Sequence, residues 1–325
     1  MGPLPPATAP PLSARLPRAL GAAFSATLPI ILGAALGNVS MGFSASFGAY
    51  LVTVTHPVLP ARGGGSRIGL TVAMLSLGAT VGAISGMRIW TFLPLAIALA
   101  AWQALTEVAA TGLRLPAAMS VLAALLSCGN VGEDLPAGEY AAAFAVGAVW
   151  QGAVQFACAR SPRASTTTFT ADLAALGASW RPARRFAGVM AAAGLIGGGV
   201  AAALPVPHAV WLLTAALRVM RPQRETTWQR LQQRFAGTAA GALIAASLLA
   251  VRLPALLHGA IVAVALTAMQ LVGARRYALW TCCLTVIALD LGTLPQNTGW
   301  GIAAGRLLLT IGGLALAALF APALP

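Results

Sequence analysis

Long apolar runs alternate along the chain with short segments that carry arginine, proline or polar residues. A helix that crosses a membrane needs about 20 mainly apolar residues, and most of the runs approach that length. The pattern therefore predicts an all-α polytopic membrane protein. We expect twelve spans, at residues 19–36, 41–57, 68–87, 89–107, 115–129, 139–158, 186–203, 208–220, 236–251, 254–272, 277–291 and 300–321.

The spans fall into two sets of six. We expect a first half at residues 15–158 and a second half at 185–325, joined by a cytoplasmic linker at 159–184. Residues 1–14 are rich in proline and lack the basic and then apolar order of a signal peptide. We interpret them as a disordered tail and the first run as a retained helix.

The composition supports the membrane interpretation. Hydrophobic residues make up 58% of the 325 residues and charged residues only 8%, whereas a soluble domain carries roughly 25% charged residues. The formal net charge is +13, but the basic residues lie between apolar runs rather than along one face. This arrangement argues against nucleic acid as a partner and favours orientation in a lipid bilayer.

All 20 basic residues are arginines, and their distribution predicts the orientation. If the N-terminus is cytoplasmic, 17 of the 20 lie on the cytoplasmic side, two lie outside (Arg88 and Arg252), and Arg306 lies within a span. Positive residues concentrate on the cytoplasmic side of membrane proteins. We therefore expect both termini in the cytoplasm.

The two halves share several sequence features. Each has a short span that ends in proline, at Pro57 and Pro222, followed by a basic cytoplasmic segment. Gly78 and Gly82 of the first half match Gly237 and Gly241 of the second. Glycines at this spacing let helices approach closely, either between the halves or within each one. Six spans per half predict a parallel repeat, which suits a transporter but also fits inherited duplication without moving parts.

The chain from Pro207 onward contains a distinctive set of motifs. They are Pro207-His208-Ala-Val-Trp211, Arg218-Val-Met-Arg221-Pro222, Gly237-Thr238-Ala-Ala-Gly241, Arg276-Tyr277-Ala-Leu-Trp280 and, in the last span, Arg306. With these motifs the chain resembles the fusaric acid resistance and aromatic acid exporter family of bacterial inner-membrane proteins. That family includes p-hydroxybenzoic acid efflux proteins and is related to plant aluminium-activated malate transporters.

The resemblance covers residues 181–321 and is weaker in the first half, where Arg62-Gly-Gly-Gly-Ser-Arg67 replaces the basic segment of the family. It implies export of small, often aromatic, carboxylates. Long members of the family carry a sizeable cytoplasmic domain, whereas the linker expected here is short. A periplasmic adaptor partner is therefore left open.

Ionisable groups inside spans are costly and are candidates for function. Asp290 and Arg306 flank a short hairpin, so the two side chains can meet. They would then either form a structural salt bridge or act in transport. In the second case Arg306 would bind a substrate carboxylate and Asp290 would couple protons.

Two further groups are candidates for proton coupling. Glu107 lies near the inner end of its span, and Arg114 follows seven residues later, so one helical face can join them. The alternative for Glu107 is a side chain that reaches the membrane interface. His56 precedes Pro57 and titrates near neutral pH, or it is a hydrogen-bonded interfacial residue.

Short, proline-ended spans at matching positions of two halves mark transport sites. The second span offers Tyr50 and Thr53, and the eighth offers Trp211 and Thr214. Their rings and hydroxyl groups suit an aromatic carboxylate. The alternative places Trp211 in an interfacial belt and the hydroxyl groups in helix packing.

A basic cytoplasmic loop is expected between the eighth and ninth spans, and its arginines are Arg218, Arg221, Arg224, Arg230 and Arg234. These residues either contact anionic lipid head groups or form a positive vestibule that concentrates anionic substrates. Mutation of Arg224 and Arg230 to Gln would raise the apparent KM at low salt in the second case.

No motif of a hydrolase, a metalloprotease or a P-loop ATPase occurs in the sequence. The four cysteines show no metal-binding spacing and are interpreted as buried apolar residues. We therefore expect no enzymatic activity, no cofactor and no metal.

The function that we expect is secondary export of small organic anions, driven by proton antiport. The partners are then the anion, protons and the bilayer, and a homodimer is as open as a monomer. Two alternatives remain, namely a passive anion channel and a membrane scaffold without transport.

Overall fold

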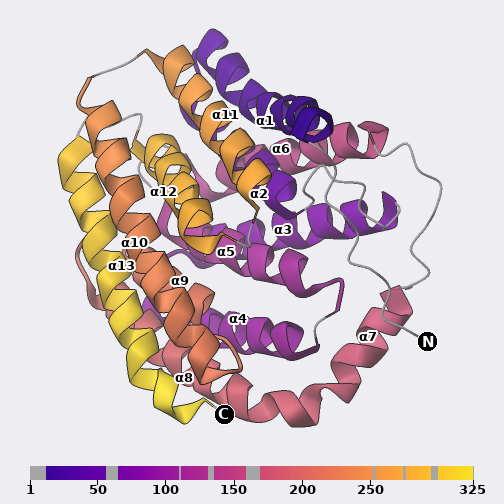
Figure 1. Ribbon diagram of the computed structural model, residues 1–325, viewed down its shortest axis with the longest axis vertical. Helices are drawn as coiled ribbons and strands as arrows, with labels where there is room; N and C mark the ends of the chain where they lie inside the picture. The colour runs from indigo at the N-terminus through magenta and orange to yellow at the C-terminus, as the bar shows by residue number, and fades with distance from the viewer. Residues whose placement is uncertain are drawn as a thin grey trace.

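A computed structural model describes residues 12–55, 65–109, 111–130, 135–158, 169–251, 254–273, 276–293 and 299–324. The described residues form helices and connections and include no strand (Figure 1). The α-helices are α1 (Leu12–Ala35), α2 (Val39–Thr55), α3 (Gly65–Ser85), α4 (Ile89–Ala109), α5 (Arg114–Asn130), α6 (Ala137–Cys158), α7 (Phe169–Ala178), α8 (Trp180–Ala203), α9 (Val210–Val219), α10 (Arg224–Leu249), α11 (Ala255–Val272), α12 (Tyr277–Thr293) and α13 (Gly299–Phe320).

Each of the twelve apolar runs corresponds to one helix, and α7 is additional. The prediction of a disordered tail up to residue 14 is wrong at its end, because α1 begins at Leu12. The linker at 159–184 also contains more structure than expected, since α7 lies within it and α8 begins at Trp180. Residues 1–11 and 159–168 lie outside the described part of the chain.

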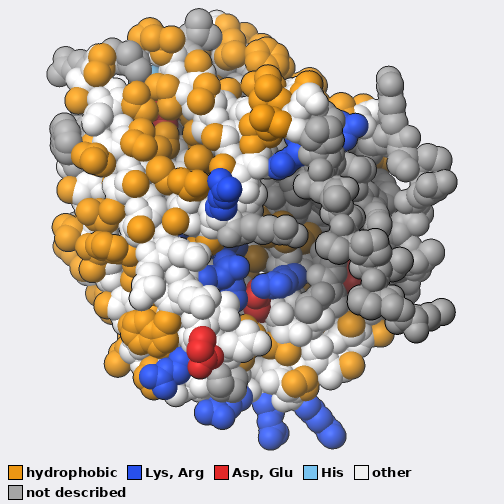
Figure 2. Space-filling model, viewed as in Figure 1, with side chains coloured by type: hydrophobic (Ala, Val, Ile, Leu, Met, Phe, Trp, Pro, Cys, Tyr) orange, Lys and Arg blue, Asp and Glu red, His pale blue; other side chains and the backbone are white. Residues whose placement is uncertain are grey.

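Six of the described helices are long and apolar enough to cross a membrane, namely α1, α3, α4, α6, α8 and α13. Large apolar side chains point away from the protein on many of them, such as Leu77, Ile84, Val146 and Leu319. Figure 2 shows apolar side chains over much of one face, with arginines toward its centre and lower edge. This surface suits lipid rather than water.

Helix packing follows the same pattern in the two halves. In the first half α2 packs against α1 and α6, and α3 packs against α5 and α6. In the second half α9 packs against α8 and α13, and α10 packs against α12 and α13. Helices α4 and α11 each contact the following helix, α5 or α12. The order of contacts is therefore the same when α1–α6 are compared with α8–α13.

The contacts between the halves are reciprocal. Helix α1 of the first half packs along α11 of the second, and α8 of the second half packs along α4 of the first. These are the first and fourth helices of each half. The short helix α9 lies inside this arrangement, and nearly all of its residues are buried. Its position allows side chains of both halves to reach it.

The recurring glycine pairs pack helices within each half. A Cβ atom on Gly78 of α3 would lie 2.6 Å from the carbonyl oxygen of Ser120 in α5. A Cβ atom on Gly241 of α10 would lie 2.6 Å from the carbonyl oxygen of Cys282 in α12. The other glycine of each pair meets the same neighbouring helix. Of the two roles considered for these pairs, the structure shows packing within each half.

Candidate anion site

Arg306 is a buried basic group of the candidate site. It lies in α13 and is only 4% exposed. Its guanidinium carbon lies 3.8 Å from the ring centroid of Trp211 in α9, so the cation covers the indole face. The His208 ring also stacks on Trp211, at a centroid distance of 4.7 Å. Trp211 is itself buried, which favours the predicted role in a site over a place in an interfacial belt.

Arg234 is a second buried arginine near Arg306. It lies in α10, is 2% exposed, and interacts electrostatically with Arg306. Two guanidinium nitrogens of each residue, Nε and Nη1, are buried without a hydrogen-bond partner among the described residues. A buried donor on a charged group is costly to leave without a partner. The two guanidinium groups therefore offer several donors to an anion.

Tyr50 is the residue of the first half that interacts with these arginines. It is a buried residue of α2, and its hydroxyl group has no hydrogen-bond partner within the described structure. It interacts electrostatically with Arg218, Arg234 and Arg306. Thr214 of α9 is buried too, and its hydroxyl oxygen is equally unpaired in the described part of the chain. Tyr50 of the first half is thus within electrostatic range of Arg306 in the second.

Arginines continue from this cluster toward the ends of α9 and α10 where the two helices are joined. The guanidinium carbon of Arg230 lies 4.7 Å from the ring centroid of Tyr277, and that of Arg218 lies 5.9 Å from the ring centroid of Trp280. Tyr277 interacts electrostatically with both arginines and with Arg234. A series of arginines beside aromatic rings therefore leads from this end of the helices to Arg306.

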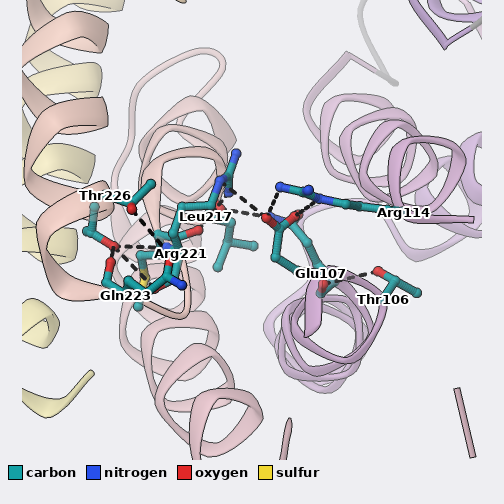
Figure 3. A network of polar contacts seen from close by, with 10 residues as sticks. Thr106, Glu107, Arg114, Leu217, Arg221, Gln223 and Thr226 are labelled. Atoms are coloured by element: carbon teal, nitrogen blue, oxygen red, sulfur yellow. Dashed lines mark hydrogen bonds and ion pairs between the residues drawn. The ribbon is translucent and has the colours of Figure 1, made fainter. Parts of the chain in front are cut away.

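Glu107 of α4 lies between Arg114 and Arg221 (Figure 3). Its carboxylate accepts hydrogen bonds from Arg114 of α5, at 2.8 Å for Nε, and forms an ion pair with Arg221, at 3.4 Å. Arg114 and Glu107 do meet, but across the connection between α4 and α5 rather than along one helical face as predicted. Burial lowers the pKa of Arg221 to about 10, although nearby Glu107 favours its charged form, so Arg221 is still protonated at neutral pH.

A hydrogen bond beside this ion pair also joins the halves. Gln103, one turn before Glu107 on α4, donates from Nε2 to the carbonyl oxygen of Leu217 in α9 at 2.8 Å. Two contacts therefore tie the end of α4 to α9 and to the connection that follows it.

The predicted meeting of Asp290 and Arg306 is wrong. Asp290 of α12 forms a hydrogen bond with His258 of α11, with 2.7 Å between Oδ1 and Nδ1. The helix ends explain the difference, because Asp290 lies three residues before the end of α12, whereas Arg306 lies seven residues after the start of α13. At 1.5 Å per residue the two differ in level by about 6 Å.

The predicted basic loop between residues 218 and 234 is also wrong as a loop. Arg218 lies in the last turn of α9, and α10 begins at Arg224. Of the five arginines only Arg221 lies in the connection. Arg234 is buried between helices, which excludes it from contact with lipid head groups, whereas Arg224 is exposed.

For two other predicted site residues, the described structure gives no contact with the buried arginines. Thr53 is buried, but its hydroxyl group donates to the carbonyl oxygen of Ala49 at 3.0 Å, so its donor is satisfied within α2. His56 lies outside the described residues.

The sequence interpretation named Arg234 only as an arginine of a basic loop, not as a buried residue, and it did not consider His258. Arg234 precedes Gly237 by three residues and Gly241 by seven, which is the spacing of one helical face. A glycine pair that packs against α12 therefore predicts burial of Arg234. His258 lies 14 residues before the end of α11, and Asp290 lies 13 residues after the start of α12. Nearly equal distances from one short connection place two residues at the same level of a helical hairpin.

The candidate site is positively charged. Arg234 and Arg306 are buried, and the structure records no salt bridge between either of them and an acidic group within its described part. Guanidinium groups bind carboxylates through parallel hydrogen bonds, and aromatic rings beside them suit an aromatic anion. No group of three or more potential metal ligands occurs among the described residues. The site is therefore suited to bind an anion rather than a cation.

Comparison with known proteins gives the family. Residues 193–320 match the model of the fusaric acid resistance protein-like family. This segment, less than half of the chain, is therefore similar to that family. The matched segment contains α9 to α13 and all the arginines of the candidate anion site. A search of curated proteins and of solved structures found no significant match.

Proteins of the fusaric acid resistance family are membrane transporters of the efflux type. The match and the six helices long and apolar enough to cross a membrane indicate an integral membrane protein.

Proposed function

We propose that this protein exports small organic anions, with aromatic carboxylates as the substrate class. The observation that carries this proposal is the pair of buried arginines, Arg234 and Arg306, with unpaired donors beside the Trp211 ring. A charged side chain within a membrane helix costs about 2.5–3.5 kcal/mol on insertion scales. An anion that occupies the site would offset this cost.

The proposed binding site uses both halves of the molecule. Arg306 and Arg234 hold the carboxylate, Trp211 and Tyr50 contact the aromatic ring, and Thr214 supplies a further hydroxyl group. Tyr50 is the contribution of the first half. A site shared by two halves is the arrangement expected for alternating access, because movement between the halves then opens the site to each side in turn.

The proposed architecture has twelve membrane-spanning helices in two parallel repeats. The reciprocal contacts of α1 with α11 and of α4 with α8 support the repeat. The arginine distribution supports cytoplasmic termini, and the family resemblance supports the bacterial inner membrane. In this orientation the arginines near the connection of α9 and α10 lie at the cytoplasmic entrance.

Proton antiport is the proposed source of energy. Asp290 supports it as a buried carboxyl group in the half of α12 that faces outward in the proposed orientation. Glu107 is a less favourable proton carrier in this arrangement, since its carboxylate is paired with two arginines.

Substitution of Arg306 by alanine tests the proposal. Cells that express this variant are expected to lose export of 4-hydroxybenzoate while the protein remains in the membrane, because the carboxylate loses its principal partner. Arg88→Ala is the matched control, since Arg88 is exposed in the connection between α3 and α4. Export measured with radiolabelled acid should be normal in the control. Retained export in Arg306→Ala, at equal expression, would contradict the assignment of the site.

A further inference from the structure

A buried pair of titratable side chains joins α11 to α12. His258 and Asp290 are 4% and 2% exposed, and their contact measures 2.7 Å between Nδ1 and Oδ1. The second carboxyl oxygen of Asp290, Oδ2, is buried without a partner among the described residues. An unpaired oxygen in a buried carboxylate is costly, and a proton on it removes the charge.

The pair is isolated from the other ionisable groups of the helices packed around it. These groups are Arg15 and Arg18 on α1, Arg224, Glu225, Arg230 and Arg234 on α10, Tyr277, Cys282 and Cys283 on α12, and Arg306 on α13. Among the described groups only His258 interacts electrostatically with Asp290. Arg15 marks the opposite end of α11, where it donates to the carbonyl oxygen of Leu271 at 2.7 Å.

We propose that the His258–Asp290 pair is the site that binds the transported proton, an inference that rests on the proposed function. With one proton shared between them, the two side chains are neutral as a pair, either as two neutral groups or as an ion pair. Without this proton the pair carries one negative charge in a buried place. The pair therefore takes up and releases a proton as a unit.

Its position suits this role. Asp290 lies 13 residues from Tyr277 along α12, which is about 20 Å at 1.5 Å per residue. In the proposed orientation the pair lies toward the outside, and the entrance arginines lie toward the cytoplasm. Helix α11 also packs along α1 of the first half, so the pair is close to a contact between the halves. A movement of α11 against α1 would change its access to water.

The proton balance of one cycle is simple. The pair takes one proton from the outer side and releases it to the cytoplasm, while one organic anion moves outward, and no covalent bond changes. His258 is a positioning residue in this scheme as well as a proton acceptor, because its ring holds one oxygen of Asp290 and leaves the other free.

Proton movement in liposomes tests the inference. The purified protein is reconstituted with a pH-sensitive dye inside the vesicles, and a gradient of 4-hydroxybenzoate is imposed. Wild-type protein is expected to move protons against the direction of the anion. Asp290→Asn and His258→Gln are expected to move protons no faster than empty liposomes. Binding of radiolabelled 4-hydroxybenzoate should stay within about twofold of wild type, since no hydrogen bond or salt bridge recorded among the described residues joins the pair to Arg234 or Arg306.

Two further variants complete the experiment. Glu139→Gln changes an exposed acid in the first turn of α6 and should move protons like wild type. Asp290→Glu keeps the titratable group and should restore part of the proton movement. Unchanged proton movement in Asp290→Asn overturns the inference. So does a joint loss of proton movement, anion binding and thermal stability in both pair variants and in Asp290→Glu, which would mark a structural role.

The wild-type result separates this inference from the proposed function. If wild-type protein neither binds nor moves 4-hydroxybenzoate, the proposed function fails and the inference fails with it. If it carries the anion without moving protons, export survives and proton binding by the pair is overturned.

Discussion

Arg306 and Arg234 differ from the other arginines of the chain in what surrounds them. Most of the others lie at helix ends, where water or lipid head groups can solvate a guanidinium group. These two are buried within helices, and one of them covers an aromatic ring. A protein that needed only orientation in the membrane would have no use for arginines in these positions. The proposed anionic ligand would account for their positions.

Tyr50 gives a prediction at the residue scale. Tyr50→Phe removes a buried hydroxyl group that has no partner in the described structure, so thermal stability should be unchanged or slightly higher. Binding of 4-hydroxybenzoate should weaken about 5- to 10-fold, because the hydroxyl group is then missing from the occupied site. Melting and equilibrium binding of the same preparation check the two effects. A lower melting temperature with unchanged affinity would show that Tyr50 serves packing.

At the scale of helices, the apolar runs predicted well where each helix lies along the chain. They predicted poorly which side chains of the helices are buried. All twelve runs are helices because a chain in lipid must satisfy its backbone hydrogen bonds within each segment. Helix α7 was missed because its ten residues lie within a linker interpreted as polar. The site was harder to predict. Composition alone assigned Arg234 to a loop, and only the packing of α10 on α12 buries it.

Pairing of side chains was the least predictable feature. Asp290 had two neighbouring helices to face, α11 and α13, and the sequence interpretation considered only the shorter hairpin with Arg306. The structure pairs it with His258, at the same level of the other hairpin. Glu107 and Arg114 meet as predicted, but across the short connection of two helices and not along the one helical face that the prediction assumed.

The glycine pairs give a prediction at the scale of helices. Gly78→Ala and Gly241→Ala each place a methyl group against a backbone carbonyl, and each should cost about 1–3 kcal/mol of stability. Gly69→Ala and Gly259→Ala are the controls within α3 and α11, since a Cβ atom there meets nothing within 4 Å. Thermal melting in detergent measures all four variants. Equal melting temperatures in test and control variants would mean that these helices do not pack as closely as described.

At the scale of the whole molecule, the two halves are joined by helix packing and by the polar contacts of α4. Glu107→Gln removes the carboxylate that Arg221 faces, and a buried charge without its partner is destabilising by about 3–5 kcal/mol. The melting temperature should therefore fall. The double variant Glu107→Gln with Arg221→Gln should recover part of the loss, because neither charge then remains unpaired. A double variant no more stable than the sum of the two single effects would contradict this coupling.

Anion export across a bilayer is the central claim, and flux in liposomes tests it most directly. The purified protein is reconstituted, and uptake of radiolabelled 4-hydroxybenzoate is followed with and without an imposed pH gradient, with Arg306→Ala and Arg88→Ala alongside. We predict accumulation above equilibrium that depends on the gradient, persists in Arg88→Ala and is lost in Arg306→Ala. Wild-type flux no greater than that of empty liposomes, across a panel of aromatic and aliphatic carboxylates, would contradict the account.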